Sequence, residues 1–135
     1  RIPAIKNSFM LDGPAIALRS QRSARRTPMM MATKQTFKNF DDMIDNSDTP
    51  VLVDFYAVWC GPCVMMSREL ATVGTDMGDK IRIVKIDTDK YPNIASRFQI
   101  AALPTCVLFK DGKPVERFEG VMPAQQISAK ISAKL

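Results

Sequence analysis

The hydrophobic residues in the middle of the chain fall into short runs, and these runs predict β-strands. The runs VLVDFYAV (51–58) and IRIVKID (81–87) are nearly continuous and rich in β-branched residues, which is typical of strands buried on both faces. The runs TCVLF (105–109) and PVERFEG (114–120) flank the sequence KDGK, and an Asp-Gly pair between two apolar runs is a strong hairpin signal. The proline that opens the second of these runs suits an edge strand.

Elsewhere the apolar residues recur at spacings of three and four, which predicts helices. Such spacing occurs at 37–44, where Asn39 or Asp41 is a candidate N-cap, and more briefly at 88–98 and 127–135. The longest helical stripe consists of Cys63, Met66, Leu70, Val73 and Met77. The order of helix, strand, helix, strand, helix, hairpin and helix predicts an α/β fold, in which a central mixed β-sheet carries helices on both faces.

The N-terminal segment has neither pattern and differs in composition from the rest. Residues 1–36 contain seven of the nineteen Lys and Arg residues and one of the fourteen Asp and Glu residues, so the rest of the chain has a net charge of −1. A basic, Ser-containing and acid-poor segment is typical of an organelle transit peptide, and the alternative is a disordered basic tail that touches an acidic partner. We therefore expect an organelle-targeting or disordered extension at 1–32 and a folded domain at 33–135.

Charge and hydropathy also narrow the classes of partner. The basic residues are concentrated in the extension and the body is close to neutral, so we expect no binding to nucleic acid. No stretch approaches the roughly 18 consecutive apolar residues that a membrane-spanning helix needs, and we expect no membrane partner either.

The sequence WCGPC places two cysteines, Cys60 and Cys63, three positions apart. A structural zinc site needs four ligands, and a chain with three cysteines and no histidine does not offer them. A disulfide across so short a loop would stabilise the fold only a little. The pair therefore indicates a reversible two-electron redox couple that needs neither a metal nor another cofactor.

The predicted helix assigns different roles to the two thiols. Cys63 lies on the apolar stripe and faces the interior, whereas Cys60 lies at the helix start, where Pro62 is well tolerated. The unpaired N–H groups and the positive dipole end at that point lower the pKa of Cys60 and favour a thiolate. We predict an exposed nucleophile at Cys60 and a shielded resolving thiol at Cys63, with Cα atoms about 5–6 Å apart.

Asp54 lies inside the apolar run VLVDF. Burial of a charged carboxylate is costly, so the pKa of Asp54 should be raised. Because the chain has no histidine, Asp54 is the best candidate for a general acid or base that exchanges a proton with the resolving thiol. The alternative is an aspartate near the strand end that is hydrogen-bonded to backbone or faces water.

Three segments resemble the thioredoxin family: VDFYAVWCGPC, IDTDKYPNIASRFQIAALPT and LFKDGKPVERFEG. The resemblance covers about residues 33–135 and is closest to the plastid thioredoxins of the y type. It implies the thioredoxin-like fold and a thiol-disulfide oxidoreductase, that is, an enzyme that reduces disulfides in target proteins. Cys60 would attack the target disulfide, Cys63 would resolve the mixed disulfide, and Asp54 would transfer the proton.

The resemblance also assigns positions around the cysteines. Pro104 falls at the family's cis-proline, whose loop offers backbone hydrogen bonds to the target chain. Lys85 matches a family lysine near the buried aspartate, where its charge would oppose the rise in the pKa of that aspartate. A flat apolar docking surface would be formed by Trp59, Gly61, Pro62, Ala102, Leu103, Gly120 and Val121.

Three positions depart from the family pattern or lack a role in it. Arg68 replaces a proline that kinks the helix after the cysteines, and it puts a charge near the docking face. Tyr56 stands where many members have a second tryptophan. Cys106 follows Pro104 by two residues, either as a small buried residue or as an oxidisable regulatory thiol.

Two other functions stay open: a docking or scaffold module without redox turnover, and a disulfide oxidase or isomerase. A plastid address, in the stroma, would imply a ferredoxin-dependent thioredoxin reductase as electron donor. A mitochondrial or cytosolic address would imply an NADPH-dependent one. The resemblance implies peroxiredoxins and methionine sulfoxide reductases as targets, and we expect a monomer.

Overall fold

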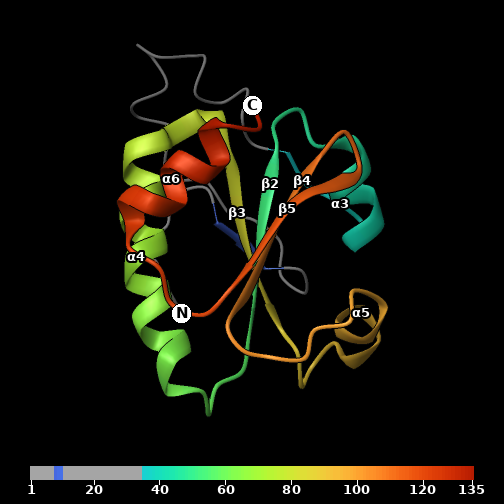
Figure 1. The fold of residues 1–135 in the computed structure, drawn as a ribbon. Coiled ribbons are helices and arrows are strands. Elements are labelled where there is room, and N and C mark those ends of the chain that lie inside the picture. Colours follow the sequence, from blue (N-terminus) through green and yellow to red (C-terminus); the bar gives the residue numbers. More distant parts are fainter. Residues whose placement is uncertain (1–7, 11–34) are drawn as a thin grey trace, which may run out of the picture.

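The computed structural model describes residues 8–10 and 35–135, and its centre is a five-stranded sheet (Figure 1). The first three strands in the chain run parallel, whereas the last two are antiparallel to their neighbours, so the sheet is mixed. Across the sheet the strands are β1 (Ser8–Met10), β3 (Arg82–Asp87), β2 (Val51–Tyr56), β4 (Thr105–Lys110) and β5 (Lys113–Glu119).

The central strand β2 is buried on both faces, as its apolar run predicts. Successive side chains of a strand point to opposite faces, so Val53 and Phe55 enter one hydrophobic cluster and Leu52 enters another. Asp54 shares the face of Leu52 and is fully buried. The alternation of β2 therefore places one carboxylate on a buried and largely apolar face.

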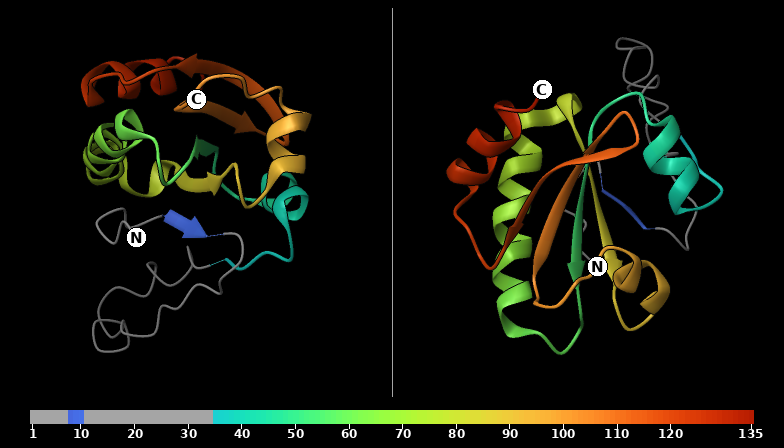
Figure 2. Two further views of the ribbon diagram at one scale, coloured as in Figure 1. Left: turned by 90° about the horizontal axis from the view of Figure 1, so that it is seen from below. Right: turned by 45° about the vertical axis from the view of Figure 1, so that its right-hand side comes forward.

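Helices cover both faces of the sheet (Figures 1 and 2). One face packs against α4 (Gly61–Met77) and α6 (Ala124–Ser132), and the other packs against α3 (Phe40–Asn46) and α5 (Pro92–Arg97). The buried residues of α4 include the whole predicted stripe from Cys63 to Met77. The predicted fold class, with a central mixed sheet and helices on both faces, is confirmed.

Local sequence signals account for where several elements begin and end. Of the two candidate caps for α3, Asn39 is the N-cap, and its side chain accepts a hydrogen bond from the backbone N–H of Asp42. In the hairpin between β4 and β5, Asp111 and Gly112 both have positive φ, 55° and 81°, which is the backbone that a tight two-residue turn requires. Pro114 lies in the edge strand β5, where its missing N–H breaks no ladder.

The structure differs from the predictions in two respects. Several elements are shorter than their apolar runs: β2 ends at Tyr56, and α5 begins only at Pro92. Strand β1, which pairs with β3, lies within the range expected to stay outside the fold. A three-residue strand is too short to show an alternating pattern in the sequence, and its pairing is made by backbone groups. The predicted transit peptide otherwise lies outside the described residues.

Candidate active site

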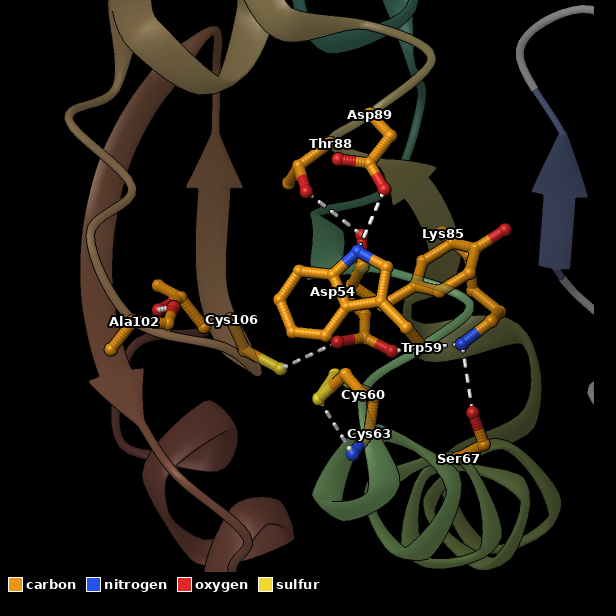
Figure 3. Close-up of a disulfide and its surroundings, with 12 residues drawn as sticks. Asp54, Trp59, Cys60, Cys63, Ser67, Lys85, Thr88, Asp89, Ala102 and Cys106 are labelled. Carbon is orange, nitrogen blue, oxygen red and sulfur yellow. Dashed lines mark hydrogen bonds and ion pairs between the residues drawn. A yellow bond between two sulfur atoms is a disulfide. The ribbon is translucent and has the colours of Figure 1, made fainter.

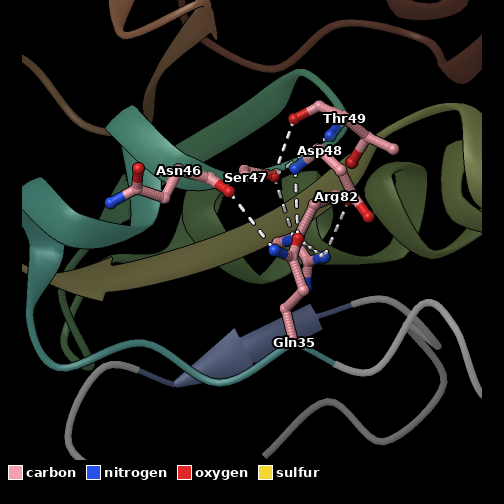
Figure 4. Close-up of polar contacts among 6 residues, drawn as sticks. All are labelled: Gln35, Asn46, Ser47, Asp48, Thr49 and Arg82. Atoms are coloured by element: carbon pink, nitrogen blue, oxygen red, sulfur yellow. Dashed lines mark hydrogen bonds and ion pairs between the residues drawn. The ribbon is translucent and has the colours of Figure 1, made fainter.

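Cys60 and Cys63 form a disulfide at the start of α4, and their Cα atoms are 5.3 Å apart, within the predicted range (Figure 3). Cys60 is the N-cap of α4 and Pro62 lies in the first turn, as the sequence predicts. The backbone N–H of Cys63 donates to Cys60 Sγ at 3.2 Å. When the disulfide is open, the same N–H and the helix dipole stabilise negative charge on Cys60.

Both cysteines are buried, with exposed fractions of 5% for Cys60 and 3% for Cys63. The prediction of an exposed Cys60 is therefore wrong, because Cys60 packs with Ala57 and Leu103 in a small cluster. The two thiols still differ in access. A shallow hollow of about 380 Å³ is lined by Cys60, together with Trp59, Gly61, Pro62, Thr88, Ile100, Ala101 and Leu103.

Trp59 forms an exposed wall of this hollow. Its side chain is 70% exposed, and its indole N–H donates to Asp89 Oδ2 at 2.8 Å (Figure 3). This hydrogen bond fixes one end of a large apolar ring beside the cysteines. Further exposed apolar side chains belong to Val58, Val64, Met65 and Val121.

The loop before β4 forms the opposite side of the site. The Leu103–Pro104 peptide bond is cis, as the resemblance implies. Pro104 is buried, and its carbonyl accepts a hydrogen bond from the N–H of Gly120 at 2.8 Å. That bond brings Gly120 and the exposed Val121 next to the loop that carries Ala102 and Leu103. Four of the predicted docking residues line the hollow, namely Trp59, Gly61, Pro62 and Leu103, and the flat docking surface stays a prediction.

Asp54, Lys85 and Cys106 lie in one row across the three central strands. Asp54 pairs with Lys85 in the β2–β3 register and with Cys106 in the β2–β4 register. Lys85 Nζ is 3.0 Å from Asp54 Oδ2, and Cys106 Sγ is 3.9 Å from Asp54 Oδ1. In Figure 3 the Asp54 carboxylate lies between these two partners and points toward the cysteine pair. The alternative of a water-facing aspartate is wrong, because Asp54 is 0% exposed.

The environment of Asp54 pushes the pKa of its carboxyl in two directions. Burial raises the pKa, whereas the charge and hydrogen bond of Lys85 and the thiol of Cys106 lower it, and the net direction is upward. Lys85 is itself held by Ser67 Oγ at 2.8 Å and lies 4.3 Å from the centre of the Tyr56 ring. A carboxyl with a raised pKa next to a redox pair is suited to carry a proton.

Cys106 is fully buried on the same face. Burial, followed by the nearby Asp54 carboxylate, raises the pKa of its thiol. Oxidation proceeds through an accessible thiolate. Of the two interpretations of Cys106, these properties therefore favour a small buried residue with a neutral thiol over an oxidisable regulatory thiol.

A family model described as Thioredoxin matches residues 31–133. The chain belongs to the thioredoxin family. It is 53% identical over 116 residues to Thioredoxin Y, chloroplastic, of Oryza sativa subsp. japonica, and this match covers 86% of this chain and 68% of that protein. It is 57% identical to Thioredoxin Y2, chloroplastic, of Arabidopsis thaliana, and this match covers 77% of this chain and 62% of that protein. The chain therefore spans about two thirds of the length of these relatives.

Solved thioredoxin structures agree with this membership. A chain from a crystal structure of chloroplastic thioredoxin z has a TM-score of 0.63 and 41% sequence identity, and the match covers 67% of this chain and 82% of that chain. The resemblance to thioredoxins, and to their plastid y type, is thereby confirmed. Members of this family are protein-disulfide oxidoreductases, and Cys60 and Cys63 form the redox-active pair of this one.

Within this thioredoxin, two departures from the family pattern, Arg68 and Tyr56, lie on the side of the sheet that α4 covers. Arg68 is exposed, and α4 runs through it without a break. Tyr56 lies at the end of β2, where its ring faces Lys85. Neither substitution disturbs the disulfide, and Tyr56 adds a contact to the lysine of the buried pair.

Five residues at the site were not predicted from the sequence. They are Ser67, Asp89 and three residues that line the hollow: Thr88, Ile100 and Ala101. Ser67 follows Cys63 by four residues, so a polar residue on the buried stripe of α4 was the available signal. The sequence near Asp89 and near the other hollow residues does not indicate that they belong to the site. Their contacts join segments that are far apart in the chain, such as Trp59 and Asp89.

Two negative observations concern only residues 8–10 and 35–135. No group of three or more His, Cys, Asp or Glu residues in these ranges is arranged to hold a metal ion. No helix in this part of the chain is long and apolar enough to cross a membrane.

Proposed function

We propose that this thioredoxin is a protein-disulfide reductase. The observation that carries the proposal is the asymmetry of the cysteine pair: Cys60 lines the hollow at the start of α4, and Cys63 lies behind it on the buried stripe. A target disulfide that enters the hollow meets Cys60 first. A carboxyl group that can exchange a proton lies buried in the sheet below.

The reaction proceeds by two exchanges of sulfur–sulfur bonds. In the first, the Cys60 thiolate attacks one sulfur of the target disulfide, which breaks the target bond, forms a mixed disulfide and releases the other target sulfur as a thiolate. In the second, Cys63 attacks Cys60 Sγ and releases the target's remaining sulfur. The two target sulfurs take up protons, and two electrons pass from the chain to the target as the Cys60–Cys63 disulfide forms.

Asp54 acts in the second exchange. Cys63 must lose its proton before it can attack, and the chain offers no histidine to take it. A carboxylate whose pKa is raised by burial accepts a proton more readily than an ordinary one. Lys85 at 3.0 Å opposes this rise in the pKa and so favours the ionised carboxylate, which is the form that can accept a proton.

The docking surface consists of the hollow and its apolar rim. A target strand lies along the loop that ends at Pro104, with backbone hydrogen bonds to that loop, and its apolar side chains contact Trp59 and Val121, both of which are exposed. The full set is Trp59, Gly61, Pro62, Ala102, Leu103, Pro104, Gly120 and Val121. Contacts of this kind are transient, so the chain acts as a monomer.

The protein acts in the plastid stroma, a localisation that two relatives and the N-terminal composition support. The rice and Arabidopsis proteins are both named as chloroplastic, and the basic, acid-poor composition of residues 1–32 is typical of an organelle transit peptide. In the stroma, a ferredoxin-dependent thioredoxin reductase returns the electrons. Peroxiredoxins and methionine sulfoxide reductases, which form disulfides during turnover, are the targets.

A redox titration of the Cys60–Cys63 pair tests this proposal. The oxidised protein is equilibrated with a series of dithiothreitol buffers, and the exposed thiols are labelled and counted. We expect a two-electron transition near the potential of about −270 mV known for thioredoxin. Cys106 supplies an internal check, because it is buried and reacts with the label only after unfolding. Cys60→Ser is the control and has no disulfide to titrate.

The alternatives predict other results. A midpoint near about −180 mV, the range of protein disulfide isomerase, would identify an oxidase or isomerase. A pair that does not titrate at all would identify a docking module. Either result would overturn the reductase.

A further inference from the structure

The two oxygens of the buried Asp54 carboxylate have different partners. Oδ2 accepts a hydrogen bond from Lys85 Nζ at 3.0 Å, and the same ammonium group donates to Ser67 Oγ at 2.8 Å. Oδ1 faces Cys106 Sγ at 3.9 Å on the opposite side (Figure 3). The carboxylate is thus held by a cation on one oxygen and by a thiol on the other.

This arrangement makes Oδ1 the better site for a proton. An ammonium group has three donors and no acceptor, so the oxygen that accepts from Lys85 is the less basic of the two, and a hydroxyl at Oδ2 could not donate to Lys85. Oδ1 faces a thiol, which is both a weak donor and a weak acceptor. When Asp54 is ionised, Cys106 S–H can donate to Oδ1, and when Asp54 is protonated, the sulfur can accept from the Oδ1 hydroxyl.

We propose that Oδ1 is the oxygen through which Asp54 takes up and releases its proton, and that Cys106 is a positioning residue that provides this oxygen with a partner in both protonation states. The inference rests on the proposed role of Asp54 in proton transfer and goes beyond it by assigning the atom and the residue. The Cys106 proton stays on sulfur throughout. Only the Asp54 proton moves, to and from Cys63, and no electrons pass through Cys106.

The register of the sheet supports this assignment. Asp54 and Cys106 are directly opposite in the β2–β4 ladder, so their side chains lie side by side on the face that α4 covers. The raised pKa of Cys106 keeps its sulfur protonated and available as a donor. A thiolate at this position would instead repel the carboxylate.

Further polar groups approach the Asp54–Cys106 pair from β3 and α4. Lys85 approaches from β3, Ser67 approaches from α4, and the cysteine pair lies at the start of α4. In the oxidised protein Cys60 and Cys63 are joined and do not titrate. A pH titration of the oxidised form therefore reports the Asp54 carboxyl without interference from the active-site thiols.

The test is a ¹³C NMR titration of the Asp54 carboxyl carbon in the oxidised full chain. Cys106→Ala removes both the donor and the acceptor, and the ionised carboxylate loses more than the neutral acid. We expect the midpoint of the titration to move to higher pH. Cys106→Ser keeps a group that donates and accepts, and it should return the midpoint toward that of the unmodified protein.

Val107→Ala is the matched control. Val107 is buried on the same strand but belongs to the cluster on the other face of the sheet. Its truncation loses buried volume without touching Asp54, and it should leave the midpoint unchanged. Equal shifts in Cys106→Ala and Val107→Ala would show a general loosening of the core and would overturn the proposal, as would an unchanged or lower midpoint in Cys106→Ala.

A second measurement separates this inference from the proposed function. The pH profile of target reduction is compared between the unmodified protein and Asp54→Asn. An unchanged profile would show that Asp54 does not transfer the proton during target reduction. Cys106 would then have no role in the reaction either. The NMR titration would still decide whether Cys106 governs the Asp54 carboxyl. If the profile does change, the effect of Cys106→Ala on it should vanish in the Asp54→Asn background.

Discussion

The two faces of the central sheet are built from the same strands but carry different groups. On the face covered by α3 and α5, Phe40, Phe98 and Phe109 pack ring against ring, with centroids 5.3–5.9 Å apart, and the strands contribute apolar side chains. On the face covered by α4 and α6, the apolar cluster borders the buried pair of Asp54 and Lys85. One face is a conventional core, and the other combines a core with a titrating group.

This difference shows how a small fold separates stability from chemistry. Aromatic packing stabilises the sheet on one side. On the other side a buried carboxyl with a raised pKa costs stability whenever it ionises. We therefore expect substitutions on the α3 and α5 face to change the free energy of unfolding at every pH, and those at the ionisable pair to change it in a pH-dependent way.

The largest loss of stability should follow Phe55→Ala. Phe55 is fully buried in the aromatic cluster, and truncation of a buried phenylalanine costs about 3–5 kcal/mol. Denaturant unfolding of the oxidised protein at two pH values measures the loss, which should be the same at both. Val58→Ala is the control, because Val58 is 77% exposed. A loss below about 1 kcal/mol would place Phe55 outside the main core.

A smaller loss should follow Lys85→Met, which leaves the Asp54 carboxylate buried without its cation. An unsatisfied buried polar group costs about 1–3 kcal/mol. The loss should shrink as the pH is lowered, because the protonated carboxyl needs no counter-charge. Denaturant unfolding at neutral and acid pH measures it, and Lys80→Met, at an exposed lysine, is the control. A loss that does not depend on pH would mean that Lys85 acts through packing alone.

Asp54→Asn should reveal the cost of ionising the carboxyl. The pKa of Asp54 is raised on folding, so the folded state binds more protons than the unfolded state between the ordinary value of 3.8 and the folded pKa. Stability of the unmodified protein therefore falls as the pH rises through this window, by at most about 1.4 kcal/mol per pH unit for one proton. Asp54→Asn should lack this slope. A similar slope in both proteins would assign it to another group.

The smallest effect should come from the surface of the α3 and α5 face. Arg97 forms a bidentate pair with Asp41, at 2.6 and 3.2 Å, in which both side chains are largely exposed. An exposed pair of this kind contributes about 0.2–1 kcal/mol. Asp41→Asn should lose that amount at low ionic strength and less in high salt. An equal loss in high salt would point to packing of Arg97 on Phe98 instead.

The sequence is a good guide to the elements and to the cysteines, because their signals are local. The apolar run around Asp54, the stripe from Cys63 to Met77 and the Asp-Gly turn each depend on neighbours in the chain, and each lies where it was predicted. The family resemblance added the cis bond before Pro104. The resemblance also anticipated the contact of Lys85 with Asp54, but neither source gave the register of the sheet or most of the tertiary contacts.

Cys106, the second partner of Asp54, illustrates that limit. Cys106 is 52 positions away in the chain, and only the β2–β4 register makes it a neighbour of the carboxylate. The exposure of Cys60 was mispredicted for a related reason. A helix start in isolation is open to water, but here Ala57 and Leu103 pack against it. The position of a thiol on a helix does not reveal what the rest of the fold places over it.

Edge strand β5 has a consequence for how these molecules behave at high concentration. An unprotected strand edge is a template on which another chain can extend the sheet. β5 begins with Lys113 and Pro114, and it carries Glu116, Arg117 and Glu119 along its length. Proline and interspersed charges make such an edge a poor template. The composition of β5 therefore disfavours sheet-to-sheet pairing between copies of the chain through this edge.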